Sequence, residues 1–442
     1  MGNNGATAMP SLQERIERHF ELKSLGTSVR TEVIAGITTF LAMSYIVAVN
    51  PAILADAGIP PAAAAFATCL VSGLGTIAMG LWARAPLAVA PGMGLNAFFA
   101  YTVVQGAGLT WQQALGMVLL SGTVFVVLTL IGVRQALLKA LPKELLPAIG
   151  AGIGMFLVVI GLSNGGFIRA HEATLVTRGD LTDPPVLLAI ATLLFTATLL
   201  SRGVRAGLLI GIGAATVVSI PLGMSGSLAQ HEGDALDAVL QLDLRGVLAW
   251  DLVDLILAMV FVDLFDSLGT MVGVIKKAGL DDGEGRVPRL GRMLGVDGAS
   301  TMAGALAGTS TVTTYIESAA GIEAGGRSGL TAVVTGILFL LSLPIVPLVS
   351  AVPSAVAAAA LIIIGATTVG LAREIDWDNI DTAVPALFVV AGMPLTYSIA
   401  DGLAMGLISY SALKILRGRA GEASWLLHVL AAVFIGRYIF FA

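Results

Sequence analysis

The sequence predicts an all-α membrane protein that crosses the bilayer many times. Of its 442 residues, 56% are hydrophobic and only 12% are charged, whereas a soluble domain carries about 25% charged residues. The apolar residues gather in runs of about 20, the length that spans a bilayer as a helix, and the links between the runs are short. The 53 glycines also fit this class, because glycine lets membrane helices approach closely.

Fourteen apolar segments are candidate spans. Two of them, 88–105 and 310–322, are too short or too irregular to cross as regular helices. A final apolar segment, 424–440, is either an interfacial helix or a fifteenth span. The fourteen segments are 30–54, 61–83, 88–105, 111–132, 147–166, 186–201, 205–224, 251–275, 290–307, 310–322, 327–350, 354–372, 380–397 and 400–416.

Charge placement predicts the orientation. With the N-terminus in the cytoplasm and the spans alternating, 20 Lys and Arg residues fall in cytoplasmic segments and three, Arg169, Arg178 and Arg245, fall outside. An excess of basic residues marks the cytoplasmic side of a membrane protein, so we expect both termini there. The N-terminal segment, 1–29, is polar and predicts a short amphipathic helix, without the layout of a cleaved signal peptide.

The spans divide into two sets of seven. An external acidic linker, 225–250, separates a first repeat, 30–224, from a second, 251–417, and a tail follows at 418–442. Because seven is odd, the second repeat must run inverted relative to the first. Each repeat has its irregular segment in third place, and such a pair points to a transporter binding site. The other long external link, 167–185, is predicted as a loop.

The stretch Val260–Gly273 carries carboxylates inside an apolar span. A carboxylate at the bilayer centre costs at least about 2.5–3.5 kcal/mol, so it persists only where it faces the protein interior or a water-filled cavity. We expect this stretch to line a substrate site, with a structural hydrogen bond between helices as the alternative for each acid. Its polar residues recur at helical spacing and form one stripe: Asp263, Asp266, Ser267 and Thr270.

The two irregular segments supply further polar groups at membrane depth. In the first, extended backbone through Ala88–Ala90 and a helix from about Leu95 place Asn96 near the midplane. In the second, the β-branched Thr309–Thr314 suits a short extended piece, and Glu317 then falls in the first turns of a half-helix. Positive helix ends favour anionic or electron-rich groups of a ligand nearby.

The acids identified inside the spans are therefore Asp263, Asp266 and Glu317. All four histidines fall outside the spans, so a coupled proton must be carried by a carboxylate, and we assign this role to Asp263 and Glu317. Carboxylates also bind the N–H edges of a heterocycle by paired hydrogen bonds. Asn96 either orients such a ligand or ties backbone segments together.

Hydroxyl and aromatic side chains complete the candidate site. Thr314 and Phe98 are further candidate substrate contacts. Phe98, Phe99 and Tyr315 either stack on a planar ligand or pack against neighbouring helices. The single cysteine, Cys69, excludes an internal disulfide and a cysteine-based metal site.

Five stretches of the chain resemble the AzgA-like purine permeases of the nucleobase–cation symporter-2 (NCS2) superfamily. The resemblance extends over essentially the whole of 30–442. The stretches are RTEVIAGITTFLAMSYIVAVNPAIL (30–54), APGMGLNAFF (90–99), FVDLFDSLGTMVG (261–273), GTSTVTTYIESAAGIEAGGRSGLTAVVTG (308–336) and MPLTYSIADG (393–402).

The resemblance implies an inverted repeat of seven plus seven spans. Spans 1–4 and 8–11 would form a core domain, spans 5–7 and 12–14 a gate domain, and short strands in spans 3 and 10 would meet at the site. Family members take up adenine, guanine or hypoxanthine, generally with protons. Related folds form dimers, so a homodimer is implied as well. The family's substrate contacts fall on Asn96, Asp263, Asp266 and Glu317 of this chain.

The predicted function is proton-coupled import of purine nucleobases across a bacterial inner membrane, without a cofactor or a metal and without nucleic acid as a partner. Glu317 would accept hydrogen bonds from ring N–H groups, and Asp263 would bind the other polar edge or carry the proton, tuned by Asp266. Sodium coupling stays open. The alternatives are a uracil or xanthine/urate transporter, a sulfate-type anion transporter, for which a basic site is expected, and a membrane-embedded enzyme, against which the lack of a motif such as HExxH counts.

Overall fold

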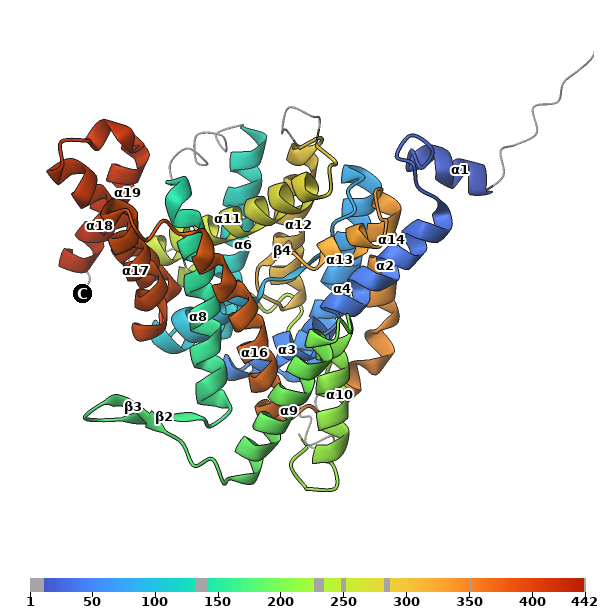
Figure 1. Ribbon diagram of the computed structural model, residues 1–442, viewed down its shortest axis with the longest axis horizontal. Helices are drawn as coiled ribbons and strands as arrows, with labels where there is room; N and C mark the ends of the chain where they lie inside the picture. Colours follow the sequence, from blue (N-terminus) through green and yellow to red (C-terminus); the bar gives the residue numbers. More distant parts are fainter. Residues whose placement is uncertain are drawn as a thin grey trace, which may run out of the picture.

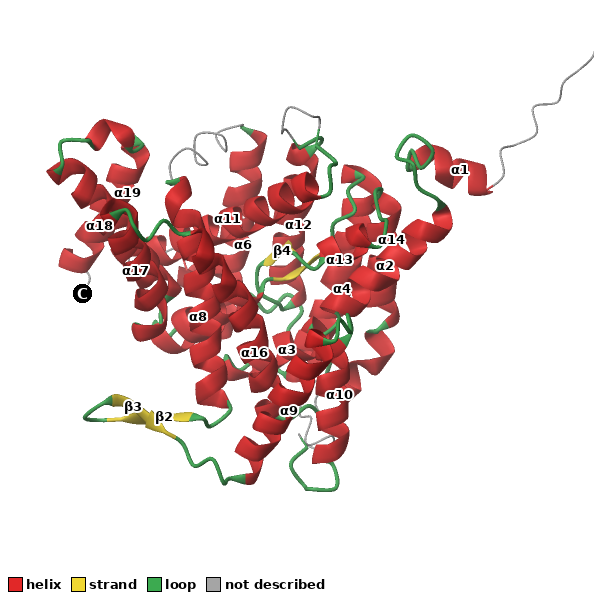
Figure 2. Cartoon of the chain, in the orientation of Figure 1, coloured by secondary structure: helices red, strands yellow, loops and turns green. Residues whose placement is uncertain are grey.

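The computed structural model describes residues 12–131, 142–225, 234–247, 252–281, 287–349 and 351–440, and this part of the chain is mostly helical (Figure 1). Portions of the predicted N-terminal segment (1–11) and acidic linker (226–233 and 248–250) lie outside the described residues, as does residue 251 of the predicted second repeat. Figure 2 shows helices throughout and short strands at two places, near the middle of the molecule and at its lower edge.

The first half of the chain forms helices at the predicted segments. The amphipathic N-terminal helix is present as α1. The elements of the first half are α1 (Leu12–His19), α2 (Val29–Met43), α3 (Ile46–Asp56), α4 (Pro61–Ala78) with a π-helical end η1 (Met79–Ala83), β1 (Val89–Pro91), α5 (Met93–Ala97) continued by the π-helix η2 (Phe98–Gly106), α6 (Trp111–Leu130), η3 (Lys143–Leu145), α8 (Leu146–Asn164), β2 (Ile168–His171), β3 (Leu175–Arg178), α9 (Pro184–Ser201), α10 (Gly207–Ser219) and η4 (Arg245–Val247).

The second half of the chain also forms helices at the predicted segments. Its elements are α11 (Val253–Lys277), α12 (Leu290–Ala307), β4 (Val312–Thr314), α13 (Ser318–Glu323), α14 (Gly329–Leu341), η6 (Leu343–Ile345), α15 (Val346–Val349), α16 (Ser354–Val369), η7 (Gly370–Glu374), α17 (Ile380–Leu395), α18 (Ile399–Leu416), η8 (Ala420–Glu422) and α19 (Trp425–Phe440). Among the described residues, nine helices are long and apolar enough to cross a membrane. The full set of fourteen spans in an inverted repeat stays a prediction.

Two segments differ from the sequence prediction. The first span is not one helix, because α2 ends at Met43 and α3 begins at Ile46. The link 167–185, predicted as a plain loop, contains the antiparallel hairpin of β2 and β3. The hairpin strands are mostly exposed. With neither face buried, they need no alternation of apolar and polar residues, which is the pattern that distinguishes a strand from a loop in a sequence.

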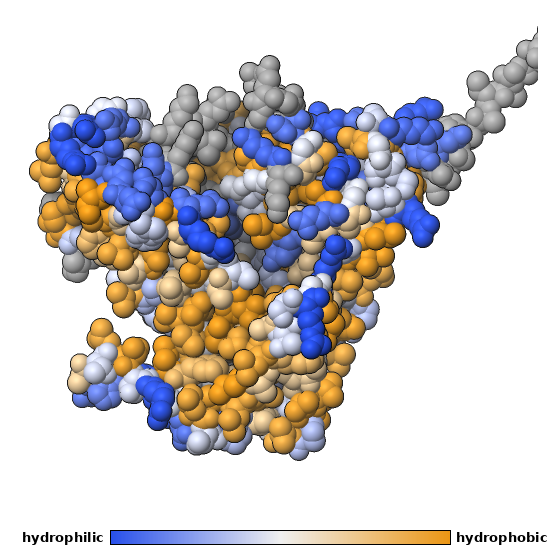
Figure 3. All heavy atoms as spheres, viewed as in Figure 1, coloured by the Kyte–Doolittle hydropathy of each residue, from blue (hydrophilic) through white to orange (hydrophobic). Residues whose placement is uncertain are grey.

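The surface is divided into a polar end and an apolar belt. Hydrophilic side chains gather at the top of the view in Figure 3, near α1 and the C-terminal helices, and apolar side chains cover the lower part around α9 and α10. Leu194 on α9, Val217 on α10 and Leu341 on α14 are all exposed. Such a belt of exposed apolar side chains is what contact with lipid requires.

The helices pack in two groups. In one, α14 packs on α2 and α4, and α12 packs on α4 and α6; in the other, α8 packs on α16 and α17, and α17 packs on α18. Each group has a close crossing at paired glycines. A Cβ added to Gly336 of α14 would lie 2.6 Å from the carbonyl oxygen of Gly73 on α4, and one added to Gly365 of α16 would lie 2.6 Å from that of Gly154 on α8. Glycine is therefore needed at both crossings.

The strands β1 and β4 come from the two irregular segments and pair with each other. They run antiparallel, with Val89 opposite Thr314, Ala90 opposite Thr313 and Pro91 opposite Val312. Both strands are fully buried. The extended pieces expected from the sequence are thus present, and they satisfy their backbone groups by pairing within the protein, as extended backbone at membrane depth must.

Candidate functional site

The strand pair is the centre of the candidate site. Its backbone hydrogen bonds continue beyond the strands. The amide of Tyr315 donates to the carbonyl of Ala88 at 2.9 Å, and the amide of Gly92 donates to the carbonyl of Thr311 at 3.0 Å. The hydroxyl of Tyr315 donates to the carbonyl of Pro91 at 2.5 Å. These bonds fix the two irregular segments against each other, so the half-helices that follow them start from one rigid unit.

The stripe on α11 faces this strand pair. Ser267 lies 2.8 Å from the hydroxyl of Thr313, and Thr313 donates to Asp266 at 3.3 Å. Asp266 is exposed, whereas Asp263, one turn earlier, is fully buried. Neither carboxylate oxygen of Asp263 has a hydrogen-bond partner among the described residues. The two acids that the sequence placed on one face are thus brought together at the site, and Asp266 is the accessible one.

A fourth acid, Asp297 on α12, completes the cluster and was missed by the sequence analysis. It is fully buried and accepts hydrogen bonds from Ser267 at 2.6 Å and from the hydroxyl of Thr314 at 3.2 Å. The amide of Thr314 also donates to it, and it interacts electrostatically with Asp263. Asp297 stands in the middle of the predicted span 290–307, so the rule applied to Val260–Gly273 would have found it.

Glu317 is held by a residue from the break in the first span. It is the residue directly before α13, is half-buried, and accepts a hydrogen bond of 2.6 Å from the hydroxyl of Tyr45. Tyr45 lies between α2 and α3 and is itself buried. Nothing in the sequence pointed to Tyr45, because an unbroken helix through 30–54 offered no reason to single it out.

The remaining predicted site residues are engaged within the protein. Asn96 on α5 is fully buried, and its side-chain oxygen accepts a hydrogen bond from the hydroxyl of Ser310, just before β4. The hydroxyl of Thr314 is used by Asp297. Phe98 and Phe99 at the start of η2 are fully buried.

The acids are accessible from one end of α11. Exposed residues follow one face of this helix from Asp266 through Gly269 and Gly273 to Lys276. Ile316, directly before Glu317 in the chain, leaves 63% of its surface exposed. Solvent therefore reaches Asp266 and Glu317 from the end of α11 that carries Lys276.

The opposite end is closed by a hydrogen-bonded cluster. Tyr101 on η2 donates to Asp56 at the end of α3 at 2.6 Å, and Asn164 at the end of α8 donates to Asp56 at 3.1 Å and to the Tyr101 hydroxyl at 3.0 Å. The ring of Tyr397, between α17 and α18, packs edge-on against those of Tyr101 and Phe156. This cluster joins α3 and η2, which contact α4 and α6 of the first packing group, to α8 and the α17–α18 turn of the second.

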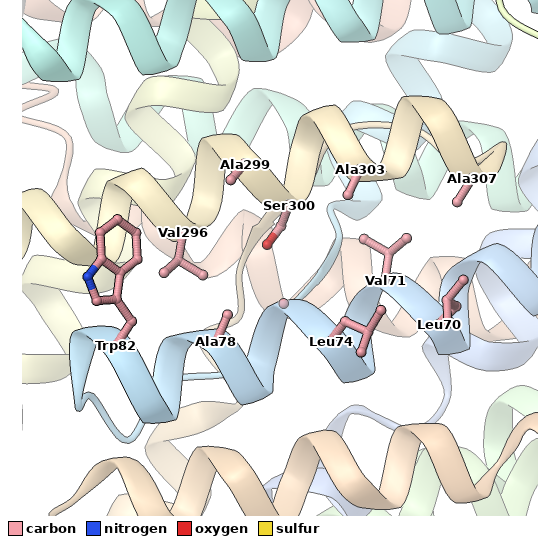
Figure 4. Close-up of a pocket in the computed structure, with 11 residues that line it drawn as sticks. Leu70, Val71, Leu74, Ala78, Trp82, Val296, Ala299, Ser300, Ala303 and Ala307 are labelled. Carbon is pink, nitrogen blue, oxygen red and sulfur yellow. The ribbon is translucent and has the colours of Figure 1, made fainter. Parts of the chain in front are cut away.

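A separate cavity of about 300 Å³ lies between α4 and α12 (Figure 4). It is lined by small and apolar residues such as Val71, Ala78 and Ala303. Its outer residues Leu74 and Trp82 are exposed. The four acids do not line this cavity, so it is not the candidate substrate site.

Known proteins resemble this chain in sequence and in fold. A protein-family profile described as "Permease family" matches residues 30–439. The chain belongs to this family. The adenine permease AdeP of Escherichia coli (strain K12) is 42% identical, over 98% of both chains. The guanine/hypoxanthine permease PbuG of Bacillus subtilis (strain 168) is 45% identical, over 95% of this chain and 99% of its own length.

Among solved structures, the transmembrane domain of the cyanobacterial bicarbonate transporter BicA is similar in fold. Its TM-score is 0.65 at 18% sequence identity, covering 84% of this chain and 97% of that domain. At this identity the likeness concerns the fold alone. The resemblance to NCS2 nucleobase permeases is confirmed by the family match and the relatives. The protein is thus a multi-pass membrane transporter, and the enzyme alternative is wrong.

Proposed function

We propose that this permease imports purine nucleobases (adenine, guanine or hypoxanthine) together with protons. The relatives AdeP and PbuG carry these substrates in their names and align over nearly the full chain. The observation that supports the proposal most is the cluster of four carboxylates beside the strand pair. A purine offers ring and exocyclic N–H groups, and carboxylates accept such hydrogen bonds strongly.

The two accessible acids are the proposed purine ligands. Asp266 is exposed and Glu317 is half-buried, so both carboxylates can be reached by a ligand from the open end. Glu317 would accept from the ring N–H groups while Tyr45 orients it. Asp266 would accept from the other polar edge of the base.

The buried acid Asp263 is the proposed proton carrier. Its oxygens have no hydrogen-bond donor in the described part of the chain, and burying an ionised carboxylate without a partner is costly. A bound proton removes this cost. Asp297, which interacts electrostatically with Asp263, would link the proton to the strand pair through Thr314.

The same cluster argues against the sulfate-type alternative. An anion placed beside Asp266 and Glu317 would meet like charges, which is unfavourable. The fold likeness to a bicarbonate transporter therefore does not extend to this chemistry. Uracil and xanthine/urate stay as competing substrates, since they too present N–H edges.

Transport would follow from movement of the two packing groups against each other. We propose the first group as the core domain and the second as the gate domain of an alternating-access cycle. The open end at Lys276 would face the cytoplasm, in agreement with the charge distribution, and the closed end at Tyr101 would face outside. The chain would act in a bacterial inner membrane, and a homodimer would be its assembly.

Uptake by purified protein in liposomes tests this proposal. Labelled adenine, guanine and hypoxanthine are offered under an inward proton gradient, with a protonophore and with sodium in place of the gradient. Wild type should accumulate at least one purine, and the protonophore should abolish accumulation. Glu317→Gln and Asp263→Asn should both abolish accumulation, whereas Asp180→Asn, in the exposed link beyond the β2–β3 hairpin, should not. Wild-type accumulation by either site variant would contradict the assignment.

A further inference from the structure

The outer edges of the strand pair need hydrogen-bond partners. In an antiparallel pair, alternate residues bond across to the other strand and those between them turn their N–H and C=O groups away. Because Ala88 and Gly92 bond across to Tyr315 and Thr311, the outward residue at the start of β1 is Val89, and that of β4 is Val312. Both are fully buried, so their backbone groups must be satisfied by the protein.

One threonine satisfies each of these edges. The amide of Val89 donates to the hydroxyl of Thr76 at 3.0 Å, and the same hydroxyl lies 3.1 Å from the Val89 carbonyl, to which it donates. The amide of Val312 donates to the hydroxyl of Thr301 at 3.2 Å, and that hydroxyl donates to the Val312 carbonyl at 2.8 Å. Both threonines are fully buried.

The two threonines are equivalent under the local two-fold symmetry of the strand pair. The register places Val89 opposite Thr314 and Pro91 opposite Val312, so Val89 in β1 corresponds to Val312 in β4. Thr76 and Thr301 each lie on the long helix that precedes the strand they bind, α4 and α12. The same backbone contact has therefore been built twice, once in each half of the chain.

The residues next to the two threonines on α4 and α12 line a cavity. Gly75 and Ser300, the neighbours of the two threonines, line the cavity between α4 and α12, and Figure 4 shows small side chains from both helices pointing into it. The threonine hydroxyls are thus the contacts that α4 and α12 make to the backbone of Val89 and Val312, and Asp297 on α12 adds a contact to Thr314.

We propose that Thr76 and Thr301 are positioning residues of the substrate site. The strand held by Thr301 ends at Thr314, three residues before Glu317, and the strand held by Thr76 ends at Pro91, five residues before Asn96. A displacement of either strand would move the carboxylate that accepts from the base, and errors of about 1 Å at such a site can lower rates about 100-fold. This inference rests on the proposed purine transport.

Isosteric substitution separates positioning from packing. Thr76→Val and Thr301→Val keep the shape of the side chain and remove the hydroxyl, and each should raise the KM for purine uptake by roughly 10- to 100-fold. Thr76→Ser and Thr301→Ser keep the hydroxyl and should stay within about 3-fold of wild type, since the backbone bonds are retained. Thr192→Val is the matched control, because Thr192 is buried but only bonds the Leu188 carbonyl within α9.

The pattern across these variants decides the outcome. A KM near the wild-type value in both valine variants would overturn the proposal, and so would an equal loss in the serine and valine variants. The maximal rate per folded molecule, counted by gel filtration in detergent, should fall less than KM rises. A general loss of folding would instead lower the amount of protein and leave the KM of the remainder unchanged.

Amide hydrogen exchange of wild-type protein gives a second test that needs no variant and no substrate. The amides of Val89 and Val312 should exchange at the slow rate of the ladder amides of Gly92 and Tyr315. Fast exchange at Val89 and Val312 would overturn the threonine contacts even if both valine variants failed to fold. If wild type binds no purine yet these two amides are protected, the proposed function fails and the strand contact stands.

Discussion

The two strands of the pair are each held by a buried threonine, but the residue one helical turn before that threonine differs between them. One helical turn before Thr301 stands Asp297, which accepts from the amide of Thr314. One turn before Thr76 stands Ser72, which is fully buried and whose hydroxyl has no hydrogen-bond partner in the described part of the chain. The residue of β1 equivalent to Thr314 is Pro91, which has no amide hydrogen to donate. Ser72 is left unpaired for this reason.

The same contrast recurs beyond the strands. Under this symmetry, the equivalent of Glu317 is Gly94 on α5. A Cβ added to Gly94 would lie 2.5 Å from Cγ2 of Ile153 on α8, so a side chain there would have to displace Ile153. The first half therefore serves as a tightly packed backbone support, and the acids that could bind a base are concentrated in the second half. Two strands with equivalent backbone contacts can thus form a site in which only one half of the chain provides the acids.

The largest effect is expected at Asp297. Asp297→Ala would leave the Thr314 amide, the Thr314 hydroxyl and Ser267 without their common acceptor, at about 1–3 kcal/mol for each buried donor. We expect uptake to fall by at least about 100-fold, measured as initial rates in liposomes after correction for folded protein. Uptake close to wild type would show that the second half does not depend on this acid.

A substitution at Gly94 should have an intermediate effect. Gly94→Ala adds a methyl group against Ile153, and overpacking of this kind typically costs 1–3 kcal/mol. Because α8 belongs to the proposed gate domain, the maximal uptake rate should fall while purine binding in detergent is retained. Gly94→Ala combined with Ile153→Ala, which makes room, should restore the rate. If the double variant is no better than the single one, contact with Ile153 is not the reason for glycine.

The closed end, built mostly by first-half residues, should respond more weakly. Tyr101→Phe removes the hydroxyl that bonds Asp56 and Asn164. We expect a loss of about 0.5–1.5 kcal/mol and faster hydrogen exchange in η2, measured by mass spectrometry. Tyr438→Phe is a control, since its hydroxyl bonds Asp401 on α18, which is not a residue of this cluster. Unchanged exchange in η2 would mean that the cluster does not hold this end closed.

The smallest effect is expected at Ser72, and it is the direct counterpart of Asp297. Ser72→Ala removes a buried hydroxyl that has no partner, so the free energy of unfolding should change by less than about 0.5 kcal/mol or rise. Thermal unfolding in detergent and uptake in liposomes measure this. A marked loss of uptake would break the comparison, because it would give the first half a polar role of its own.

Sequence reasoning found the acids that stand out from an apolar run. Asp263, Asp266 and Glu317 could be predicted as site residues because a charge inside a membrane span is costly and is retained mostly where it has a function. The interrupted segments predicted the strands. The accessibility of the acids was not legible. Asp266 is exposed and Asp263 is buried, although both lie on one helical stripe, because the neighbouring elements decide which turn is covered.

Contacts between distant residues were also beyond the sequence. Tyr45 bonds Glu317 across 272 positions, and no local pattern encodes such a pair. The contact of Asn96 with the hydroxyl of Ser310, 214 positions away, could not be predicted from the sequence for the same reason. The two threonines were invisible for the same reason, since one buried hydroxyl in a helix looks like any other.

Ligand-dependent thermal stability of the purified permease tests the central claim most directly. A ligand present at 100 times its Kd stabilises the folded state by about 2.7 kcal/mol. Adenine, guanine or hypoxanthine should raise the Tm of wild type, and should fail to do so in Glu317→Gln, while sulfate and bicarbonate should leave both unchanged. A Tm that rises with sulfate or bicarbonate and not with any purine would contradict the account.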